Sequence, residues 1–252
     1  MIPIVGRAIV HADAVELARS AAEDFASLAR KAVQDRGHFA AALTGGSSPA
    51  ALYRMLGQDD IASRIPWREV HLFWGDDRVV PPAHPRSNFG LAHRLFIQRV
   101  PIPEENLHRV HGELGARRAA KRYAEELASF FTAPPSFDLI HLGLGDDGHI
   151  ASLFPFDRHA LLEREEPAVA TLFRGLGEWR VTVTYPVLNA ARRLEFLLPS
   201  EGKAAIAHTA MYGPIDPIRI PAQRVNPAGG DLIWRVTRSL ADLARSPSGP
   251  RR

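Results

Sequence analysis

The stretch HFAAALTGGSSPAALYRML, residues 38–56, joins a short apolar run, a glycine-serine turn and the beginning of an amphipathic segment. Its run FAAAL has the length of a buried strand, and the glycines that follow interrupt regular structure. Pro49 stands where a helix can begin, because a proline at the first helical position gives up no hydrogen bond. The stretch therefore predicts a strand, a tight turn and a helix in direct succession.

The same alternation continues on both sides of this unit. Residues 14–36 place apolar side chains at helical spacing up to Gly37, a residue type that is common at helix ends. Further apolar runs and amphipathic segments are EVHLFWGDD, NFGLAHRLFIQRV, ARRAAKRYAEELASFF, FDLIHLGLGDDG, RVTVTYPVL, RLEFLLP, EGKAAIAHTAM and DLIWRV with a final helix. Strands that are apolar on both faces and separated by helices predict an α/β fold, with a mostly parallel sheet and helices on both faces.

Length and composition allow one substantial core. The chain has 252 residues, of which 46% are hydrophobic, so we expect a single domain over residues 1–244. The polar tail RSPSGPRR, residues 245–252, is expected to be disordered. The formal net charge of +3, from 31 basic and 28 acidic residues, lacks the basic excess of nucleic-acid-binding proteins. We therefore expect no nucleic-acid partner.

The sequence contains no cysteine. This absence excludes disulfides, thiolate nucleophiles and cysteine-ligated zinc. The N-terminal sequence lacks a basic segment followed by a long apolar one, and no run of 18 apolar residues occurs. We therefore expect a cytoplasmic protein without a membrane partner, present as a monomer or a weak homodimer.

In open α/β sheets, ligands bind beyond the carboxyl ends of the strands, so the residues that follow each strand are candidates for function. The first such segment is the turn with Gly45, Gly46 and Ser47. Glycines let the backbone approach a ligand closely, and the amides at a helix start favour an anion such as phosphate. The alternative is structural, with Ser48 capping the helix. The turn is neither a Walker A loop nor a GxGxxG motif, which argues against a nucleotide.

The second segment is HLFWGDDRVVPPAHPRSNFG, residues 71–90, which carries acidic and basic side chains after a strand. Such side chains can hold sugar hydroxyls, orient a histidine or contact a phosphate. The alternative is a surface ion pair worth at most about 1 kcal/mol. The side chains concerned are Asp76, Asp77, Arg78, Arg86, Ser87 and Asn88.

The third segment, GLGDDGH at residues 143–149, leads from an apolar strand to His149. Histidine titrates near neutral pH, so a neutral His149 can take a proton from water and return it to a leaving oxygen. A metal site formed by Asp146, Asp147 and His149 is the alternative, although the usual ligand spacings are absent. His141, inside the strand, is expected to be a hydrogen-bonded core residue.

Five motifs in this order and spacing resemble the 6-phosphogluconolactonase family: TGGSSP, WGDDRVVPPAHPRSN, GLGDDGHIASLFP, RVTVTYPVLNAAR and EGKAAIA. The resemblance runs from about residue 40 to residue 236, and the segment around His149 is its most specific part. It implies a Rossmann-like α/β fold shared with sugar-phosphate isomerases and deaminases. It also implies hydrolysis of 6-phosphoglucono-1,5-lactone to 6-phosphogluconate in the oxidative pentose phosphate pathway, without a metal or other cofactor.

The resemblance implies a catalytic role for two residues. His149 matches the family's proposed general base, and Asp76 matches the acidic residue that begins the family's Asp-Glu-Arg element. We expect His149 to deprotonate water for attack on C1 and then to protonate the departing ring oxygen, while Asp76 holds His149 or a substrate hydroxyl. The oxyanion donor is expected among the backbone N–H groups of the glycine turn. Asp77 departs from the family, which commonly has glutamate there.

The resemblance also implies a set of substrate-binding residues. It assigns the phosphate to the glycine-serine turn, with two cations nearby and one further basic residue at the substrate. These residues are Gly45, Gly46, Ser47, Arg78, Lys203 and, at the substrate, Arg180. Because the carboxyl ends of parallel strands meet at one edge of a sheet, we expect these distant segments to lie together.

Two other functions are alternatives. A glucosamine-6-phosphate deaminase would share the fold and the phosphate site, but Asp-Asp-Arg and ASLFP replace the Asp-Glu-Tyr and Phe-Asn-Glu expected of it. A sensor that binds a sugar phosphate without turnover would usually carry a DNA-binding segment, and none is evident in the sequence.

Overall fold

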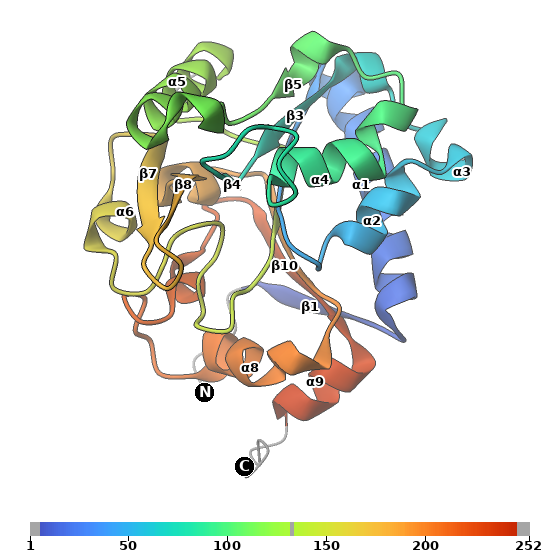
Figure 1. Cartoon of the computed structure of the whole chain (residues 1–252). Helices are drawn as coiled ribbons and strands as arrows, with labels where there is room; N and C mark the ends of the chain where they lie inside the picture. The colour runs from blue at the N-terminus through green and yellow to red at the C-terminus, as the bar shows by residue number, and fades with distance from the viewer. Residues whose placement is uncertain (1–5, 132–133, 246–252) are drawn as a thin grey trace.

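The computed structural model describes residues 6–131 and 134–245, without the side chain of residue 245. Apart from residue 245, the tail expected to be disordered lies outside the described residues. A seven-stranded sheet forms the centre, and its neighbouring strands all run parallel, which confirms the predicted α/β fold (Figure 1). In spatial order its strands are β1 (Arg7–His11), β10 (Asp231–Thr237), β9 (Arg193–Leu198), β6 (Leu139–Leu142), β2 (Phe39–Leu43), β3 (Val70–Trp74) and β5 (Leu107–His108).

Helices cover both faces of this sheet, as predicted (Figure 1). One buried cluster includes α1 (Ala14–Arg36), α2 (Ala50–Leu56), α3 (Asp59–Ala62) and α4 (Asn88–Leu95). The other includes α5 (Ala116–Phe130), α6 (Arg158–Leu162), α7 (Tyr185–Asn189), α8 (Ala204–Tyr212) and α9 (Arg238–Arg245). Strand β2 shows why its run is apolar throughout: Ala41 and Leu43 face the first cluster, whereas Ala40 and Ala42 face the second. No helix among the described residues is long and apolar enough to cross a membrane.

Helix α1 has the bounds that its sequence predicts. It begins after Asp13, whose carboxylate accepts hydrogen bonds from the N–H groups of Val15 and Glu16 at 2.8 and 2.9 Å. It ends at Gly37, which has a φ of 82°, a left-handed conformation that favours glycine. The helix thereby delivers the chain to the start of β2.

A second, three-stranded sheet was not predicted from the sequence. Its order is β4 (Asp76–Arg78), β8 (Glu178–Val183) and β7 (Ala168–Phe173), and both pairings are antiparallel. The motif RVTVTYPVL therefore adds no strand to the parallel sheet: it ends β8, and its second part begins α7, where Pro186 fits the first helical turn. Within this small sheet Arg78 lies opposite Arg180.

His141 is fully buried in β6, as predicted, but its hydrogen bonding differs from the prediction. Neither ring nitrogen has a hydrogen-bond partner among the described residues. Burial lowers the pKa of His141 to about 4, so the ring is neutral at pH 7. The nearby carboxylate of Glu195, 3.8 Å from Nε2, accepts instead from Nε of Arg235 at 2.6 Å. The prediction of a hydrogen-bonded histidine is therefore wrong, because the nearby Glu195 carboxylate pairs with Arg235 and lies beyond hydrogen-bond distance of the His141 ring.

Candidate active site

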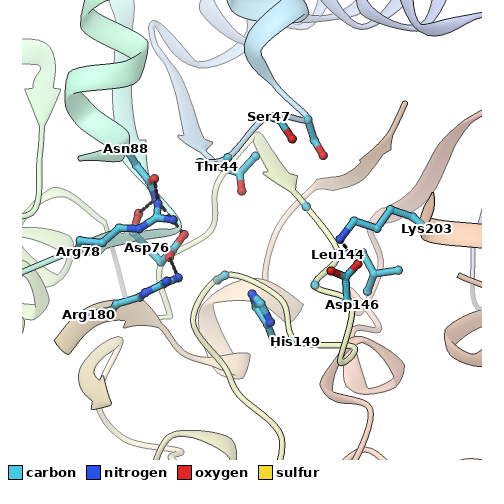
Figure 2. Close-up of a pocket in the computed structure, with 16 residues that line it drawn as sticks. Thr44, Ser47, Asp76, Arg78, Asn88, Leu144, Asp146, His149, Arg180 and Lys203 are labelled. Atoms are coloured by element: carbon cyan, nitrogen blue, oxygen red, sulfur yellow. Dashed lines mark hydrogen bonds and ion pairs between the residues drawn. The ribbon is translucent and has the colours of Figure 1, made fainter. Parts of the chain in front are cut away.

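A cavity of about 250 Å³ opens where the segments after β2, β3, β6 and β9 meet. Figure 2 shows Asp76, Arg78 and Arg180 on one side, Lys203 on the opposite side and His149 between them. The residues assigned to catalysis and substrate binding from the sequence all line this cavity, whereas the other candidates Asp77, Arg86, Ser87 and Asp147 do not. The lining residues are Thr44, Gly45, Gly46, Ser47, Ser48, Asp76, Arg78, Asn88, Gly143, Leu144, Gly145, Asp146, His149, Ala151, Arg180 and Lys203.

The shape of the glycine-serine turn depends on both glycines. A Cβ atom on Gly45 would lie 1.8 Å from Oδ1 of Asn88, so a larger residue would displace that amide. Gly46 has a φ of 85°, a left-handed conformation that favours glycine. The buried hydroxyl of Tyr53 donates to the carbonyl of Thr44 at 2.6 Å and accepts from its N–H at 3.1 Å. The turn is therefore held in one shape beside the cavity.

Helix α2 begins one residue later than predicted. Pro49 precedes the helix, and its carbonyl accepts from the N–H of Tyr53 at 2.9 Å. The predicted alternative of a Ser48 cap is wrong, because the Ser48 hydroxyl has no hydrogen-bond partner among the described residues. The N–H groups of Ser47 and Ser48 likewise lack an acceptor in the described part of the chain. They are donors available to a ligand in the cavity.

Asp76 is buried beside the cavity and is held by three neighbours. Its Oδ2 atom accepts from the Ser152 hydroxyl at 2.6 Å and lies 3.9 Å from Nη1 of Arg180. The side-chain amide of Asn88 donates to the backbone carbonyl of Asp76 at 2.8 Å and to Oδ1 of Asp76 at 3.3 Å. With only 4% of the residue exposed, the alternative of a surface ion pair is wrong here. Asp76 also does not hold His149, which was one of its two predicted roles.

Asp147 holds His149 instead. Its Oδ1 atom lies 2.6 Å from Nδ1 of His149 and also accepts from the His149 backbone N–H at 3.1 Å. Burial raises the pKa of Asp147, but the hydrogen bonds from His149 outweigh burial and bring that pKa below its ordinary value of 3.8. Asp147 is therefore ionised at neutral pH, and its carboxylate accepts a hydrogen bond from Nδ1–H of His149. Because Asp147 stands two residues before His149 in the same turn, it is nearer than Asp76.

The glycine turn makes room for the His149 ring as well as bending the chain. A Cβ atom on Gly145 would lie 2.1 Å from Nδ1 of His149, so the ring packs directly against the Gly145 backbone. The N–H of Gly145 donates to the His149 carbonyl at 2.9 Å and closes the turn. Gly148, with a φ of 85°, supplies the bend. The ring of Phe154, 4.9 Å from the His149 ring between centroids, covers another side of it.

Two arginines form the cationic side of the cavity (Figure 2). Arg180 is 8% exposed, and its guanidinium carbon lies 5.5 Å from the ring centroid of Phe154 and 5.1 Å from that of Phe173. Its Nε atom donates to Oε1 of Glu178 at 3.0 Å. Nε of Arg78 lies 3.7 Å from the same carboxylate oxygen. The two guanidinium groups are therefore held close together although they come from distant segments.

Lys203 lies on the opposite side of the cavity, where its Nζ donates to Oδ1 of Asp146 at 2.6 Å. The Asp146 side chain is 87% exposed, so solvent weakens this pair. Asp146 turns to Lys203 and Asp147 turns to His149, and the three predicted metal ligands do not converge on one point. Within residues 6–131 and 134–245, no group of three or more acidic or histidine side chains could hold a metal ion.

Asp77 faces away from the cavity and organises the chain around it. Its carboxylate accepts from the N–H groups of Arg78, Asn88 and Phe89 at 2.7, 2.7 and 3.0 Å, and from the Ser87 hydroxyl at 3.1 Å. Burial raises the pKa of Asp77 to about 6, although the backbone hydrogen bonds act in the opposite direction. A shorter aspartate is suited to this position because its contacts are with the start of α4.

Sequence reasoning missed the contribution of two carboxylates. The sequence predicts Asp147 only as an alternative metal ligand, although its position two residues before His149 in a glycine turn signals a local pair. Glu178 stands outside the five motifs, and no role is predicted for it. Its place among the arginines follows from strand pairing, for which the local sequence carries no signal.

Comparisons with known proteins connect this geometry with one family. The family described as glucosamine-6-phosphate isomerases/6-phosphogluconolactonase matches residues 12–234. The 6-phosphogluconolactonase of Synechocystis sp. is 36% identical over 220 residues, which cover 85% of this chain and 88% of that protein. The human 6-phosphogluconolactonase is 37% identical over 220 residues, with coverages of 84% and 83%. The crystal structure of 6-phosphogluconolactonase from Thermotoga maritima is 25% identical, has a TM-score of 0.77, and is matched over 92% of this chain and 98% of that one. The chain therefore belongs to the family of glucosamine-6-phosphate isomerases and 6-phosphogluconolactonases.

Proposed function

We propose that the protein hydrolyses 6-phospho-D-glucono-1,5-lactone to 6-phospho-D-gluconate, as a step of the oxidative pentose phosphate pathway. The observation that carries the proposal is the hydrogen-bonded pair of Asp147 and His149 at a cavity lined by three cationic side chains. A phosphorylated lactone requires both features, a base that activates water and cations that bind an anion. Relatives named 6-phosphogluconolactonase, 36% and 37% identical to this chain, support the proposal.

His149 acts as the general base. Because the Asp147 carboxylate accepts a hydrogen bond from Nδ1–H, Nε2 is the ring nitrogen with a free lone pair. Nε2 takes a proton from water while the water oxygen bonds to C1 of the lactone, which produces a tetrahedral oxyanion. The C1–ring oxygen bond then breaks, and the imidazolium returns the proton to the departing oxygen. Asp147 stabilises the imidazolium between the two steps, and the resulting acid loses its proton to solvent.

The oxyanion at C1 requires a hydrogen-bond donor close to His149. Among the backbone N–H groups of the glycine turn, which are the donors expected from the sequence, those of Gly145 and Gly148 already donate to the carbonyls of His149 and Gly145. Arg180 and His149 contact the same ring of Phe154, at 5.5 Å from the guanidinium carbon and 4.9 Å between ring centroids. We therefore assign the oxyanion to Arg180. Asp76, next to Arg180, accepts a hydrogen bond from a neighbouring sugar hydroxyl in this arrangement.

The phosphate binds on the opposite side of the cavity in this proposal, so Arg78, which was assigned from the sequence to the phosphate together with Lys203, lies instead on the side of Arg180 and Asp76. The N–H groups of Ser47 and Ser48, free of acceptors among the described residues, donate to it. Lys203 adds a charge-assisted hydrogen bond. A phosphate dianion competes well for Lys203, because the present partner, Asp146, is a largely exposed carboxylate.

The test is a direct assay on freshly generated lactone, corrected for spontaneous hydrolysis. We expect saturable turnover by the wild-type protein and a decrease in kcat of about 10²–10⁴-fold in His149→Ala. Glucosamine 6-phosphate serves as the control substrate, from which no ammonia should be released. Ammonia release would support the deaminase alternative. Binding of 6-phosphogluconate without lactone turnover would support the sensor and refute the proposal.

A further inference from the structure

One buried carboxylate, Glu178, lies among three arginines from different segments. Glu178 begins β8, and its side chain is 8% exposed. Its Oε1 atom accepts from Nε of Arg180 at 3.0 Å and lies 3.7 Å from Nε of Arg78. Its Oε2 atom pairs with Arg86, whose half-exposed side chain comes from the loop before α4. The reaction proposed above does not use Glu178 directly.

The register of the small sheet creates this arrangement. Arg78 of β4 lies directly opposite Arg180 of β8, so the two cationic side chains project from neighbouring strands toward the same face. Glu178 stands two residues before Arg180 and therefore projects to that face as well. Like charges on directly opposite residues are destabilising, and the Glu178 carboxylate offsets their repulsion.

Both arginines of the cavity turn the same edge toward Glu178. The Nε atom of Arg78 makes no hydrogen bond within the described part of the chain, and its ion-pair contact is with Glu178. Because a guanidinium group is planar, the direction of Nε sets the direction of both Nη atoms. Those of Arg180 and Arg78 extend toward Asp76 and Asn88, at the edge of the cavity (Figure 2).

We infer that Glu178 is a positioning residue, which directs the Nη groups of Arg180 and Arg78 toward the reacting end of the substrate. This inference rests on the proposed function. Preformed donors need no reorganisation when charge develops in the transition state, so the alignment contributes to rate as well as to binding. If Glu178 were only a countercharge, removing its charge would have the opposite effect on binding. A carboxylate that only lowers the positive charge of the site weakens the binding of an anion, so its removal would strengthen that binding.

Three substitutions separate these roles. Glu178→Gln keeps the length of the side chain and one acceptor oxygen, Glu178→Asp keeps the charge but shortens the side chain, and Glu178→Ala removes both. We expect kcat/KM for the phosphorylated lactone to fall about tenfold or more in Glu178→Ala and about threefold or more in the other two variants. The affinity for 6-phosphogluconate, measured by calorimetry, should fall in parallel.

The control is Glu113→Gln, which breaks the 2.7 Å pair between Glu113 and Arg109 outside the cavity. It should leave kcat/KM within about twofold of the wild-type value, because neither Glu113 nor Arg109 lines the cavity. A decrease confined to the Glu178 variants would thus reflect the arginines of the cavity rather than the loss of any Glu–Arg pair.

A double-mutant cycle with Arg180→Ala tests whether Glu178 acts through Arg180. In that background, adding Glu178→Ala should lower kcat/KM by less than about threefold. Three outcomes would each overturn the inference. The first is an equal loss of kcat/KM on adding Glu178→Ala in both backgrounds, and the second is an unchanged kcat/KM in Glu178→Gln and Glu178→Asp. The third is tighter product binding in Glu178→Gln. If Glu178→Ala does not fold, Glu178→Gln in both backgrounds provides the same comparison. Absence of lactone turnover in the wild-type protein would refute the proposed function, while product binding by the variants would still test the alignment.

Discussion

Gly145→Ala is expected to remove most of the activity while leaving the protein folded. The added Cβ atom would lie 2.1 Å from Nδ1 of His149 and 2.8 Å from Oδ1 of Asp147, whereas Cβ contacts below 3.0 Å essentially never occur. The imidazole must therefore move by about 0.9 Å, or the turn must open, because packed atoms cannot overlap. A misplacement of about 1 Å can cost about 10²-fold in rate. We thus expect kcat to fall about 10²-fold, which corresponds to about 2.7 kcal/mol of transition-state stabilisation.

The measurement compares kcat at saturating lactone with the thermal unfolding midpoint. Alanine suits the backbone of Gly145, whose φ is not positive, so the midpoint should change little. The matched control is Gly75→Ala, in which the nearest atom to the new Cβ is the carbonyl oxygen of Leu43 at an ordinary 3.5 Å. Normal kcat in folded Gly145→Ala would refute the reasoning that this glycine makes room for His149. Equal losses in both variants would indicate a general effect on the strand ends.

Four further predictions follow from the site. Asp147→Asn should lower kcat about 10- to 10²-fold, because the imidazolium loses a charge-assisted hydrogen bond; a normal kcat would remove Asp147 from the mechanism. Lys203→Ala should reduce kcat/KM for the phosphorylated lactone by an amount equivalent to about 1.5–3 kcal/mol of lost binding free energy, and it should hardly change kcat/KM for unphosphorylated gluconolactone. Equal losses for the two substrates at matched ionic strength would contradict the phosphate assignment. Exhaustive chelation should leave turnover unchanged, whereas a loss reversed by one divalent ion would restore the metal alternative. Burial raises the pKa of Asp77 from 3.8 to about 6, so between these values the folded protein retains a proton that the unfolded chain has released. The difference in free energy of unfolding between the wild-type protein and Asp77→Asn should therefore shift against the wild type as the pH rises from 4 to 7. Denaturant titrations that show the same difference at every pH would contradict the raised pKa of Asp77.

Elements with closely spaced signals could be predicted from the amino-acid sequence. Asp13 and Gly37 mark the ends of α1, because a capping carboxylate and a left-handed glycine act within one turn of the helix. The run FAAAL predicts β2, because both of its faces are buried. The glycines and acidic residues before His149 likewise lie within a few positions of it, so this turn could be recognised as a candidate site from the sequence.

The small antiparallel sheet gave no comparable signal. β4 has three residues, and the alternation of polar and apolar side chains in β8, EWRVTV, indicates a strand but not the strand with which it pairs. Short strands of this kind gain their stability from side-chain contacts with a partner strand, and here that partner comes from a distant part of the chain. The sheet therefore could not be inferred from spacing within either segment.

Local signals in the chain were sufficient to place five strands of the parallel sheet (β2, β3, β6, β9 and β10), the longer helices and the candidate residues at the strand ends, because apolar periodicity and turn chemistry act over a few residues. The edge strands β1 and β5 were not predicted. Which of those residues contact one another depended on the folded arrangement. Asp147, not Asp76, holds His149, and the pairing of β4 with β8 sets Glu178 between Arg78 and Arg180. The physical reason is that hydrogen bonds and ion pairs require separations of a few ångströms, and strand register, rather than distance along the chain, sets those separations.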